Sequence, residues 1–377
     1  DNYAGIAQYL QATAPPASTL VVLDAPGQQE VWRYYQEMYG LTLPTVALPQ
    51  QRPPDTTATL STLGNAVAGR QTVYALFWAV NEADPDRLVE RWLDQQAFKG
   101  LDSWQGNLRF VTYSLPTDLH CTAFTSPVRF GEAIQLTERC QPEQTAVTAG
   151  EVALVGLRWQ TLTPLAQRYK ITVQVLDSRN NVIAQRDSEP VGGSLPTDQW
   201  SVGQTVVDNH GVLIPPGTPP GAYRLILALY DDNTGERLPL SATEDSFVLG
   251  ELSIVRPQRP LPTTLLALQH TVERPIGPLT LIGYSAHRKG MAHAPDTPLV
   301  AGDVVEFTFF WQAPKPLPSH WPADLTFTLT VGDQSVTLPL AGDGYPTRQW
   351  QAGEQIRSKA ELLYTDQARR PQLTIGE

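Results

Sequence analysis

Two sequence blocks occur twice, in the same order, in the C-terminal two thirds of the chain. Residues 149–160 begin with AGEV and end with WQ, and residues 301–312 begin with AGDV and end with WQ, so the second copy lies 152 positions after the first. The pattern PT-x-QW-x-x-G fills residues 196–203 and returns at 346–353, an offset of 150. Matching blocks at nearly one spacing indicate a duplicated module, and a chain of 377 residues has room for two or three domains.

The repeated module is predicted to be an antiparallel β-sandwich with an Ig-like arrangement. Several segments of the first copy alternate apolar and polar residues with the period of two that is typical of half-buried strands. These segments are residues 152–159, 169–176, 182–186 and 223–230. We therefore expect one β-sandwich over residues 118–256 and a second over residues 257–377, joined by a proline-rich linker that begins at residue 256.

The first 117 residues are predicted to form a separate domain of another class. The runs TLVVLD at 19–24 and TVYALFWAV at 72–80 are continuously apolar, which is typical of strands buried on both faces. Amphipathic segments with helical spacing lie before, between and after them. Strands that alternate with helices favour right-handed crossovers and a mostly parallel sheet. We therefore expect a three-layer, Rossmann-like α/β domain over residues 1–117.

The carboxyl ends of the two apolar strands carry candidate ligand-binding residues. Asp24 and Gln28 belong to the turn after the first strand, and Asn81 and Glu82 follow the second. Open α/β sheets usually bind ligands at this edge, and a pocket lined by carboxylates and amides suits a sugar or a cation better than a phosphate. Ordinary turn chemistry is the alternative, with Asp84 as the cap of the next helix.

Trp200 and Trp350 are the second set of candidates, because an aromatic ring can stack on a sugar. Both belong to the repeated PT-x-QW pattern, however, and a feature kept in both copies also fits a packing role in the shared fold. Trp159 and Trp311 lie inside predicted strands and are expected in the core.

Cys121 and Cys140 are the two cysteines of the chain and are a candidate disulfide. They flank residues 128–136, which are predicted to form a strand. In an oxidising compartment they could close a loop of about 20 residues, which stabilises a fold by about 3 kcal/mol. Two separate buried thiols are the alternative.

Charge and motifs exclude several functions. The net charge of −11 opposes binding to nucleic acid or to an anionic membrane surface. No apolar run approaches the 18 residues of a membrane span, and neither a nucleotide-binding glycine motif nor a hydrolase motif is present. The histidines show no metal-site spacing. We expect no catalytic residue, metal or cofactor in this chain.

The sequence also resembles a family of bacterial membrane glycosyltransferases that use polyprenyl-phosphate sugars and are related to protein mannosyltransferases and aminoarabinose transferases. The similar part is the soluble region after their last membrane helix. It is carried by DNYAGIAQYL, LVVLDAPGQQEVWRYY, QRPPD, VYALFWA, DPDRLVERW, GNLRFVTY, FGEAIQL, LPTDQWSVGQ and PGAYRLILALYDDNTGERLPL, which together touch most of residues 1–250.

The resemblance implies an extracytoplasmic, non-catalytic accessory region that helps to bind or orient a glycan or protein acceptor. The family's catalytic carboxylates lie in loops between membrane helices, so none carries over to this chain. Contact with a membrane is then expected only through helices upstream of Asp1. The alternative is a secreted or cell-surface protein whose tandem β-sandwiches bind carbohydrate or protein.

Overall fold

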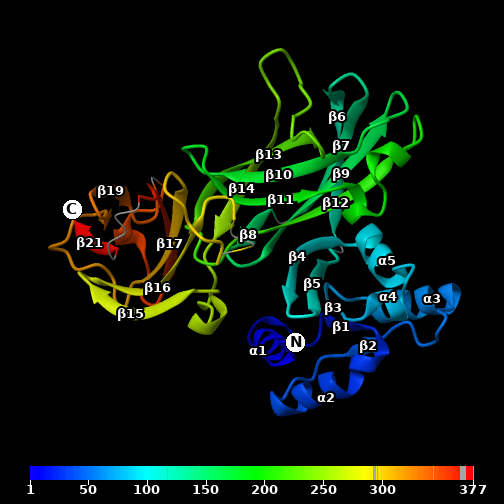
Figure 1. The fold of residues 1–377 in the computed structure, drawn as a ribbon, viewed down its shortest axis with the longest axis horizontal. Helices are drawn as coiled ribbons and strands as arrows, with labels where there is room; N and C mark the ends of the chain where they lie inside the picture. The colour runs from blue at the N-terminus through cyan, green and yellow to red at the C-terminus, as the bar shows by residue number, and fades with distance from the viewer. Residues whose placement is uncertain are drawn as a thin grey trace. The chain divides into compact units, whose positions relative to one another are not determined.

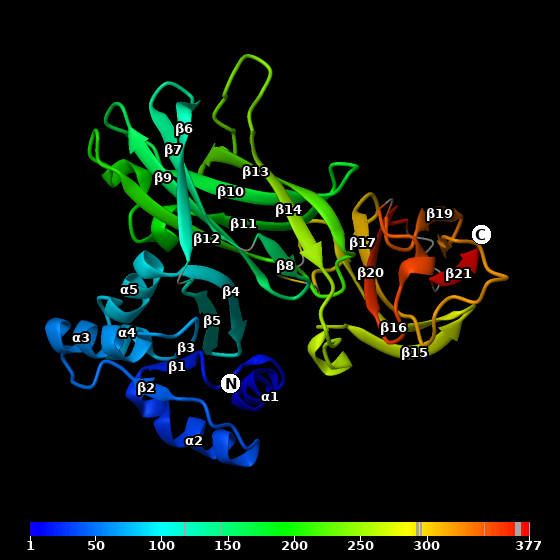
Figure 2. The ribbon, with the colours of Figure 1, turned by 180° about the vertical axis from the view of Figure 1, so that it is seen from behind.

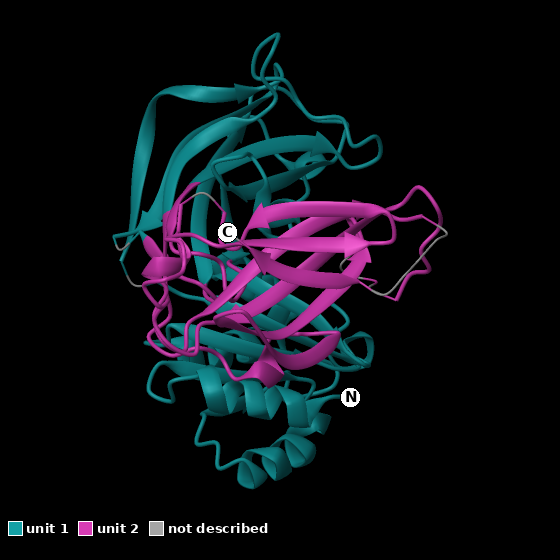
Figure 3. Cartoon of the chain, turned by 90° about the vertical axis from the view of Figure 1, so that its left-hand side faces the viewer, with its two compact units in different colours: residues 1–145, 152–213, 224–252 teal, residues 146–151, 214–223, 253–377 magenta. Residues whose placement is uncertain are grey.

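A computed structural model describes residues 1–116, 118–143, 145–291, 294, 296–342, 344–365 and 371–376. This part of the chain is rich in β-structure, with 21 strands and five α-helices. It divides into two compact units (Figure 3). Unit 1 holds residues 1–145, 152–213 and 224–252, and unit 2 holds residues 146–151, 214–223 and 253–377. No helix in the described ranges combines the length and the apolar character needed to cross a membrane.

One nine-stranded sheet runs through unit 1 (Figures 1 and 2). Its strands, in spatial order, are β2 (Thr45–Ala47), β1 (Thr19–Asp24), β3 (Thr72–Phe77), β5 (Leu108–Ser114), β4 (Phe98–Gln105), β12 (Val206–Leu213), β9 (Val152–Thr161), β7 (Ile134–Pro142) and β6 (Leu119–Phe130). β1 pairs in parallel with β2 and β3, whereas β5 is antiparallel to both β3 and β4. The sheet is therefore mixed.

The helices of unit 1 cover both faces of its first strands. They are α1 (Tyr3–Thr13), α2 (Gln29–Met38), α3 (Thr56–Val67), α4 (Val80–Ala83) and α5 (Leu88–Gln96). Alternate residues of β1 face opposite sides, as the period of a strand requires. Val21 and Leu23 pack with α1 and α2, while Leu20 and Val22 pack with α3 and α5. This explains why Leu20 to Leu23 are apolar at four consecutive positions.

The prediction of a separate three-layer, Rossmann-like domain over residues 1–117 is wrong. The segment between α5 and β5 is not a simple connection but a strand, β4, which turns at Gly106 into β5 as an antiparallel hairpin. β4 also pairs with β12 through Lys99 and His210. The first strands are thus continuous with a sheet of later strands, and the described residues as a whole hold 21 strands and five α-helices.

A second sheet of this region begins in unit 1. Its strands are β11 (Val182–Ser188), β10 (Tyr169–Leu176), β13 (Gly221–Asp231) and β14 (Phe247–Val255), followed by β8 (Ala146–Thr148). β8 pairs in parallel with Ser253, Ile254 and Val255, within unit 2. β10 extends over the residues expected from the sequence, and its inward residues Ile171, Val173 and Val175 are fully buried, while Thr172 between them is also buried.

Unit 2 contains two sheets that share one core. One has the order β15 (His270–Ile276), β16 (Leu279–Arg288), β17 (Val304–Gln312) and β20 (Gln355–Leu363), and the other has the order β19 (Gln334–Pro339), β18 (Thr326–Val331) and β21 (Gln372–Gly376). Phe309 and Trp311 of β17 pack against Phe327 of β18, with ring centroids 5.6 and 6.1 Å apart. Aromatic packing of this kind holds the two sheets together.

Short 3-10 helices connect several strands. They are η1 (Pro26–Gln28), η2 (Pro190–Gly193), η3 (Thr197–Gln199), η4 (Thr263–Leu265) and η5 (Thr347–Gln349). η3 and η5 come from the two copies of the PT-x-QW block and have the same internal geometry. The indole N–H of Trp200 donates to the Leu195 carbonyl at 3.1 Å, and that of Trp350 donates to the Tyr345 carbonyl at 3.3 Å. Each indole N–H thus bonds a carbonyl five residues earlier in the same turn.

The strands that precede these turns also match in detail. Trp159 lies on β9, between β7 and β12, and Trp311 lies on β17, between β16 and β20. Both side chains are fully buried, which confirms the expectation that they belong to the core. Gly150 and Gly302 both have positive φ, of 100° and 96°, just before the two strands. Superposition of the two copies stays a prediction.

Candidate functional site

The carboxyl ends of β1 and β3 lie side by side in unit 1 and carry the first set of predicted site residues. Asp24 is the last residue of β1 and is paired with Phe77, the last residue of β3. The backbone N–H of Trp78 donates to the Asp24 carbonyl at 2.6 Å. Asn81 and Glu82 follow in α4. The fold therefore brings these residues to one edge of the sheet, because neighbouring parallel strands end together.

Asp24 is the most unusual group at this edge. Its side chain has no exposed surface, and neither carboxylate oxygen has a hydrogen-bond partner within the described residues. Burial raises the pKa of this carboxyl to about 8, and the negative charges of Asp84 and Glu90 add to the rise. A carboxyl in such surroundings is neutral near pH 7 unless a positive charge reaches it.

The negative charge of Asp84 raises the pKa of Asp24, and the Asp84 side chain is also fully buried. Its Oδ2 accepts the backbone N–H of Val89 at 3.0 Å, in the first turn of α5. Asp84 was expected to cap this helix as its N-cap residue, but α5 begins at Leu88, and Asp84 reaches it from four positions upstream. The other oxygen, Oδ1, is buried with no partner in the described part of the chain.

A network of ion pairs, buried at Lys99, Glu90 and Asp94, lies beside the two aspartates. Lys99 Nζ lies 3.1 Å from Glu90 and 2.7 Å from Asp94, while Arg109 lies 2.8 Å from Glu90 and 2.6 Å from Asp102. Burial raises the pKa of Asp94 to about 6, although Lys99 opposes the rise. Burial would also raise the pKa of Glu90, but Lys99 and Arg109 outweigh it and hold that pKa below its usual value. These cations are thus committed to carboxylates other than Asp24 and Asp84.

Gln28, which the sequence suggested as a ligand-binding residue, lies inside the fold and not at its surface. Its side chain is buried, and its amide N–H groups donate to the carbonyls of Ala25 and Leu76 at 3.3 and 3.0 Å. Its side-chain oxygen accepts the hydroxyl of Tyr3 at 3.0 Å. Gln28 therefore satisfies the backbone of the turn, and its amide is used inside the fold.

Three side chains at this edge are open to solvent. Asn81 and Glu82 are exposed, and Trp78 keeps 37% of its surface exposed although it directly follows a buried strand. A methyl group placed on Gly27 would lie 3.7 Å from the Trp78 ring, so the turn after β1 borders this indole. Sequence reasoning missed Trp78 as a site residue, because the run TVYALFWAV was interpreted as one buried strand up to residue 80, whereas β3 ends at Phe77.

The second set of predicted residues, Trp200 and Trp350, lies elsewhere. Their exposed fractions are 5% and 3%, and each indole N–H is bonded within its own turn. A sugar could stack on either ring only after that turn had moved. Burial of this kind fits the packing role that the sequence left open.

The cysteines are joined in the structure. Cys121 of β6 and Cys140 of β7 are direct cross-strand partners and form a disulfide. We expected the cysteines to flank a single strand at residues 128–136. Instead, Gly131 turns the chain between them, and each cysteine lies on its own strand of a β-hairpin. Glu138 lies close to both sulfur atoms, but sulfur atoms in a disulfide have no thiolate to offer a metal ion.

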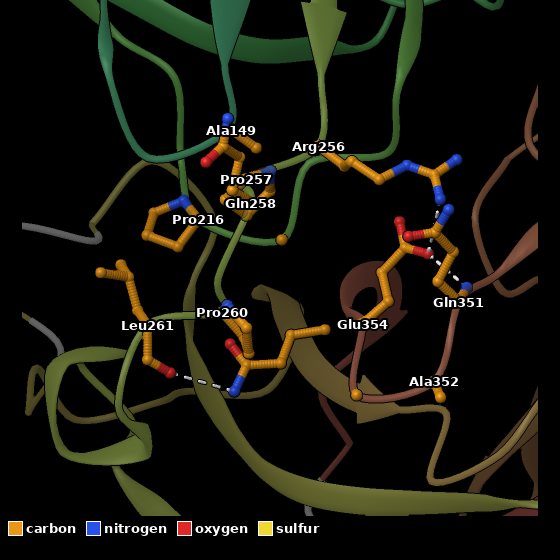
Figure 4. A pocket seen from close by; sticks show the side chains of 13 residues that line it. Ala149, Pro216, Arg256, Pro257, Gln258, Pro260, Leu261, Gln351, Ala352 and Glu354 are labelled. Atoms are coloured by element: carbon orange, nitrogen blue, oxygen red, sulfur yellow. Dashed lines mark hydrogen bonds and ion pairs between the residues drawn. The ribbon is translucent and has the colours of Figure 1, made fainter.

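An open pocket of about 500 Å³, including the solvent at its mouth, lies within unit 2 (Figure 4). Pro216, Pro257, Pro260 and Leu261 supply apolar walls. Its charged groups pair with one another, although Arg256 Nη1 has no hydrogen-bond partner among the described residues.

Arg256 Nη1 lies 3.8 Å from Glu354 in this pocket, and Glu354 also accepts the hydroxyl of Tyr345 at 2.9 Å and the backbone N–H of Gln351 at 2.7 Å. Gln355 donates its amide to the Leu261 carbonyl at 3.1 Å. Cation and anion are matched here, so the pocket has no excess charge that would select an ionic ligand.

Comparison with known proteins gives little to add. No protein-family model matches the chain, and no curated protein matches it. Among solved structures, a β-glucuronidase from glycoside hydrolase family 2 is similar over 39% of this chain and 13% of its own length, with 13% sequence identity and a TM-score of 0.20. The chain thus spans a small part of that structure, and a TM-score of this size decides neither fold nor function.

Proposed function

We propose that this chain is a non-catalytic accessory region of a membrane glycosyltransferase that uses polyprenyl-phosphate sugars, and that it contacts the glycan part of an acceptor. The segments that resemble this family, from DNYAGIAQYL to PGAYRLILALYDDNTGERLPL, support the first part of the proposal. An extracytoplasmic position follows from the same proposal.

The exposed edge beyond β3 supports contact with a glycan, and the observation that carries this part is the solvent-open indole of Trp78. Carbohydrate sites combine an aromatic face, on which a sugar ring stacks, with amide and carboxylate groups that bond the hydroxyls. Trp78, Asn81 and Glu82 provide these three kinds of group within five residues. All three follow a rigid buried strand, which limits the entropy lost on binding.

Glycan-array binding followed by titration of the best-bound oligosaccharide tests this proposal. Trp78→Ala should weaken binding by about tenfold or more, the loss of roughly 1.4 kcal/mol of stacking. Trp104→Ala is the matched control, because Trp104 is also in unit 1, on β4, and is 67% exposed. Unchanged binding in Trp78→Ala, or equal loss in both variants, would contradict a sugar site at this edge.

The link to a membrane enzyme has its own test in the coding sequence upstream of Asp1. The proposal requires several hydrophobic helices of about 20 residues there. An upstream region that encodes only a signal peptide would exclude the glycosyltransferase. It would leave the alternative of a secreted or cell-surface binding protein, which the repeated Trp turns of residues 196–203 and 346–353 favour, since tandem modules are common in such proteins.

A further inference from the structure

Three buried carboxylate oxygens in unit 1 have no donor among the described residues. They are Oδ1 and Oδ2 of Asp24 and Oδ1 of Asp84. The two residues come from different elements, because Asp24 ends β1 and Asp84 lies between α4 and α5. Both side chains have zero exposed surface. Buried polar groups in folded proteins are almost always bonded, so unpartnered oxygens from two elements need a physical account.

The two side chains are directed to the same side of the sheet. Leu20 and Val22 of β1 pack with α3 and α5, and the alternation of the strand places Asp24 on that side too. Asp84 bonds the N–H of Val89, whose side chain belongs to the same cluster. The carboxyl groups therefore lie on the same side of the sheet near the start of α5, close enough that the charge of Asp84 raises the pKa of Asp24.

The neighbouring cations do not neutralise this pair. Lys99 and Arg109 are held by Glu90, Asp94 and Asp102, as described above. Arg87 is also near Asp24, but its side chain is 51% exposed and lies 3.3 Å from Glu90. Asp24 and Asp84 are thus two buried carboxyl groups, three of whose oxygens have no donor among the described residues. Full ionisation would thus leave two uncompensated negative charges in a buried region, which is costly unless they bind a cation.

We propose that Asp24 and Asp84 bind a hard divalent cation, Ca²⁺ or Mg²⁺, at the carboxyl ends of β1 and β3. An all-oxygen ligand set selects these ions over zinc or copper, which favour imidazole and thiolate. Two positive charges match the two negative charges in excess. Backbone carbonyls and water would complete the coordination, as they do in most calcium and magnesium sites. This proposal does not depend on glycan binding at Trp78.

The experiment measures bound metal and thermal stability in the same preparations. Chain treated with EDTA is dialysed against Ca²⁺, Mg²⁺ or neither, and its metal content is measured by mass spectrometry after removal of free ion. We expect one ion per wild-type chain. We also expect the melting temperature to rise by about 5–10 °C at an ion concentration roughly 100-fold above Kd. The ion that binds tightly identifies which of the two the site takes.

Asp24→Asn should remove both the bound ion and the rise in melting temperature, and Asp84→Asn should weaken binding while still accepting the Val89 N–H. Asp86→Asn is the matched control, since Asp86 is exposed two residues away from Asp84. Wild-type chain that retains no ion and melts equally in EDTA, Ca²⁺ and Mg²⁺ would overturn the proposal, and the two carboxyls would then share a proton. This readout on the wild-type chain stands even if a variant fails to fold. Glycan binding that persists in EDTA would show that the glycan site does not need the bound ion, so either proposal could fail without the other.

Discussion

Trp159 donates its indole N–H to Asp208 Oδ2 at 3.1 Å, whereas the corresponding N–H of Trp311 is buried without an acceptor among the described residues. Both rings belong to the repeated blocks and lie on strands that are paired on both sides, so they form a natural pair for comparison. Asp208 is fully buried and also accepts from Val191 and lies 2.6 Å from His210. Loss of one donor leaves a charged acceptor partly unsatisfied, which costs more than a lost neutral bond.

Trp159→Phe should therefore destabilise unit 1 more than Trp311→Phe destabilises unit 2, by about 1–3 kcal/mol. Both variants create a similar cavity, and only the first also removes a hydrogen bond to a carboxylate. Trp159→Ala should cost about 3–5 kcal/mol, as buried aromatics do. Urea unfolding of each variant measures these losses. Equal losses for the two Phe variants would mean that the Trp159–Asp208 bond contributes nothing net.

Reduction of the Cys121–Cys140 disulfide should destabilise the hairpin of β6 and β7. The bond spans 19 positions, and the closed loop restricts the unfolded chain by an amount worth about 3 kcal/mol. Cys121 is exposed, so dithiothreitol can reach it. The denaturation midpoint of the wild type should fall in the reductant, while that of the Cys121→Ser/Cys140→Ser variant should be low in both conditions. A wild-type denaturation midpoint that is the same with and without dithiothreitol would show that the disulfide does not stabilise the fold.

Lys99→Met should be strongly destabilising at pH 8 and less so at pH 5. Lys99 is the buried partner of Glu90 and Asp94, and loss of one partner from a buried pair costs about 3–5 kcal/mol. The folded-state pKa of Asp94 is already raised to about 6 and should rise further without Lys99. A carboxyl whose pKa is raised in the fold stabilises the folded state fully below pH 3.8, its pKa in the unfolded chain. This stabilisation is lost as the pH rises through the folded pKa, so the variant loses more stability at pH 8 than at pH 5.

Lys170→Met provides the control for that experiment. Lys170 pairs with Asp232 at 2.5 Å, but both side chains are about one third exposed, so the pair is worth roughly 1 kcal/mol or less. Chemical denaturation of both variants at the two pH values separates the cases. A cost for Lys99→Met that does not change with pH would mean that Asp94 does not take up a proton.

Asp24 should make the stability of the chain depend on pH when no divalent cation is present. Its pKa is 3.8 in a model peptide and about 8 in the fold, so the folded state holds its proton over that interval. The contribution is fully present below pH 3.8 and is lost as pH rises through 8. In EDTA, Asp24→Asn should therefore become more stable than the wild type as pH rises from 5 to 9. Denaturation curves that stay parallel over this range would contradict the raised pKa.

The elements that could be predicted from the sequence are those whose signal is local. TLVVLD predicts β1 at its observed bounds, because a strand buried on both faces is apolar at every position. β4 was missed because FKGLDSWQ begins buried and then alternates, a pattern that is neither an apolar run nor a clean period of two. The dipeptide Gly106-Asn107 was a usable hairpin signal between β4 and β5, and it would have argued against a parallel sheet.

The candidate site shows the same limit. Asp24 could be found from its position at the end of a buried strand, and so could its neighbours in the turn. That its oxygens lack donors could not be predicted, because the result depends on where Lys99 and Arg109, from β4 and β5, direct their charges. The role of Gln28 also depends on a carbonyl 48 residues away, at Leu76. Such relationships exist only after the chain has folded.

The Trp200 and Trp350 turns have one more consequence. Each indole is tied to a carbonyl five residues back, so the anchoring bond is closed within a single short stretch of chain. The indole hydrogen bond needs no acceptor elsewhere in the chain, so it is kept when its segment is copied or moved. A gene duplication that copied this turn would therefore also copy its stabilising hydrogen bond. The strands around each turn could then diverge in sequence.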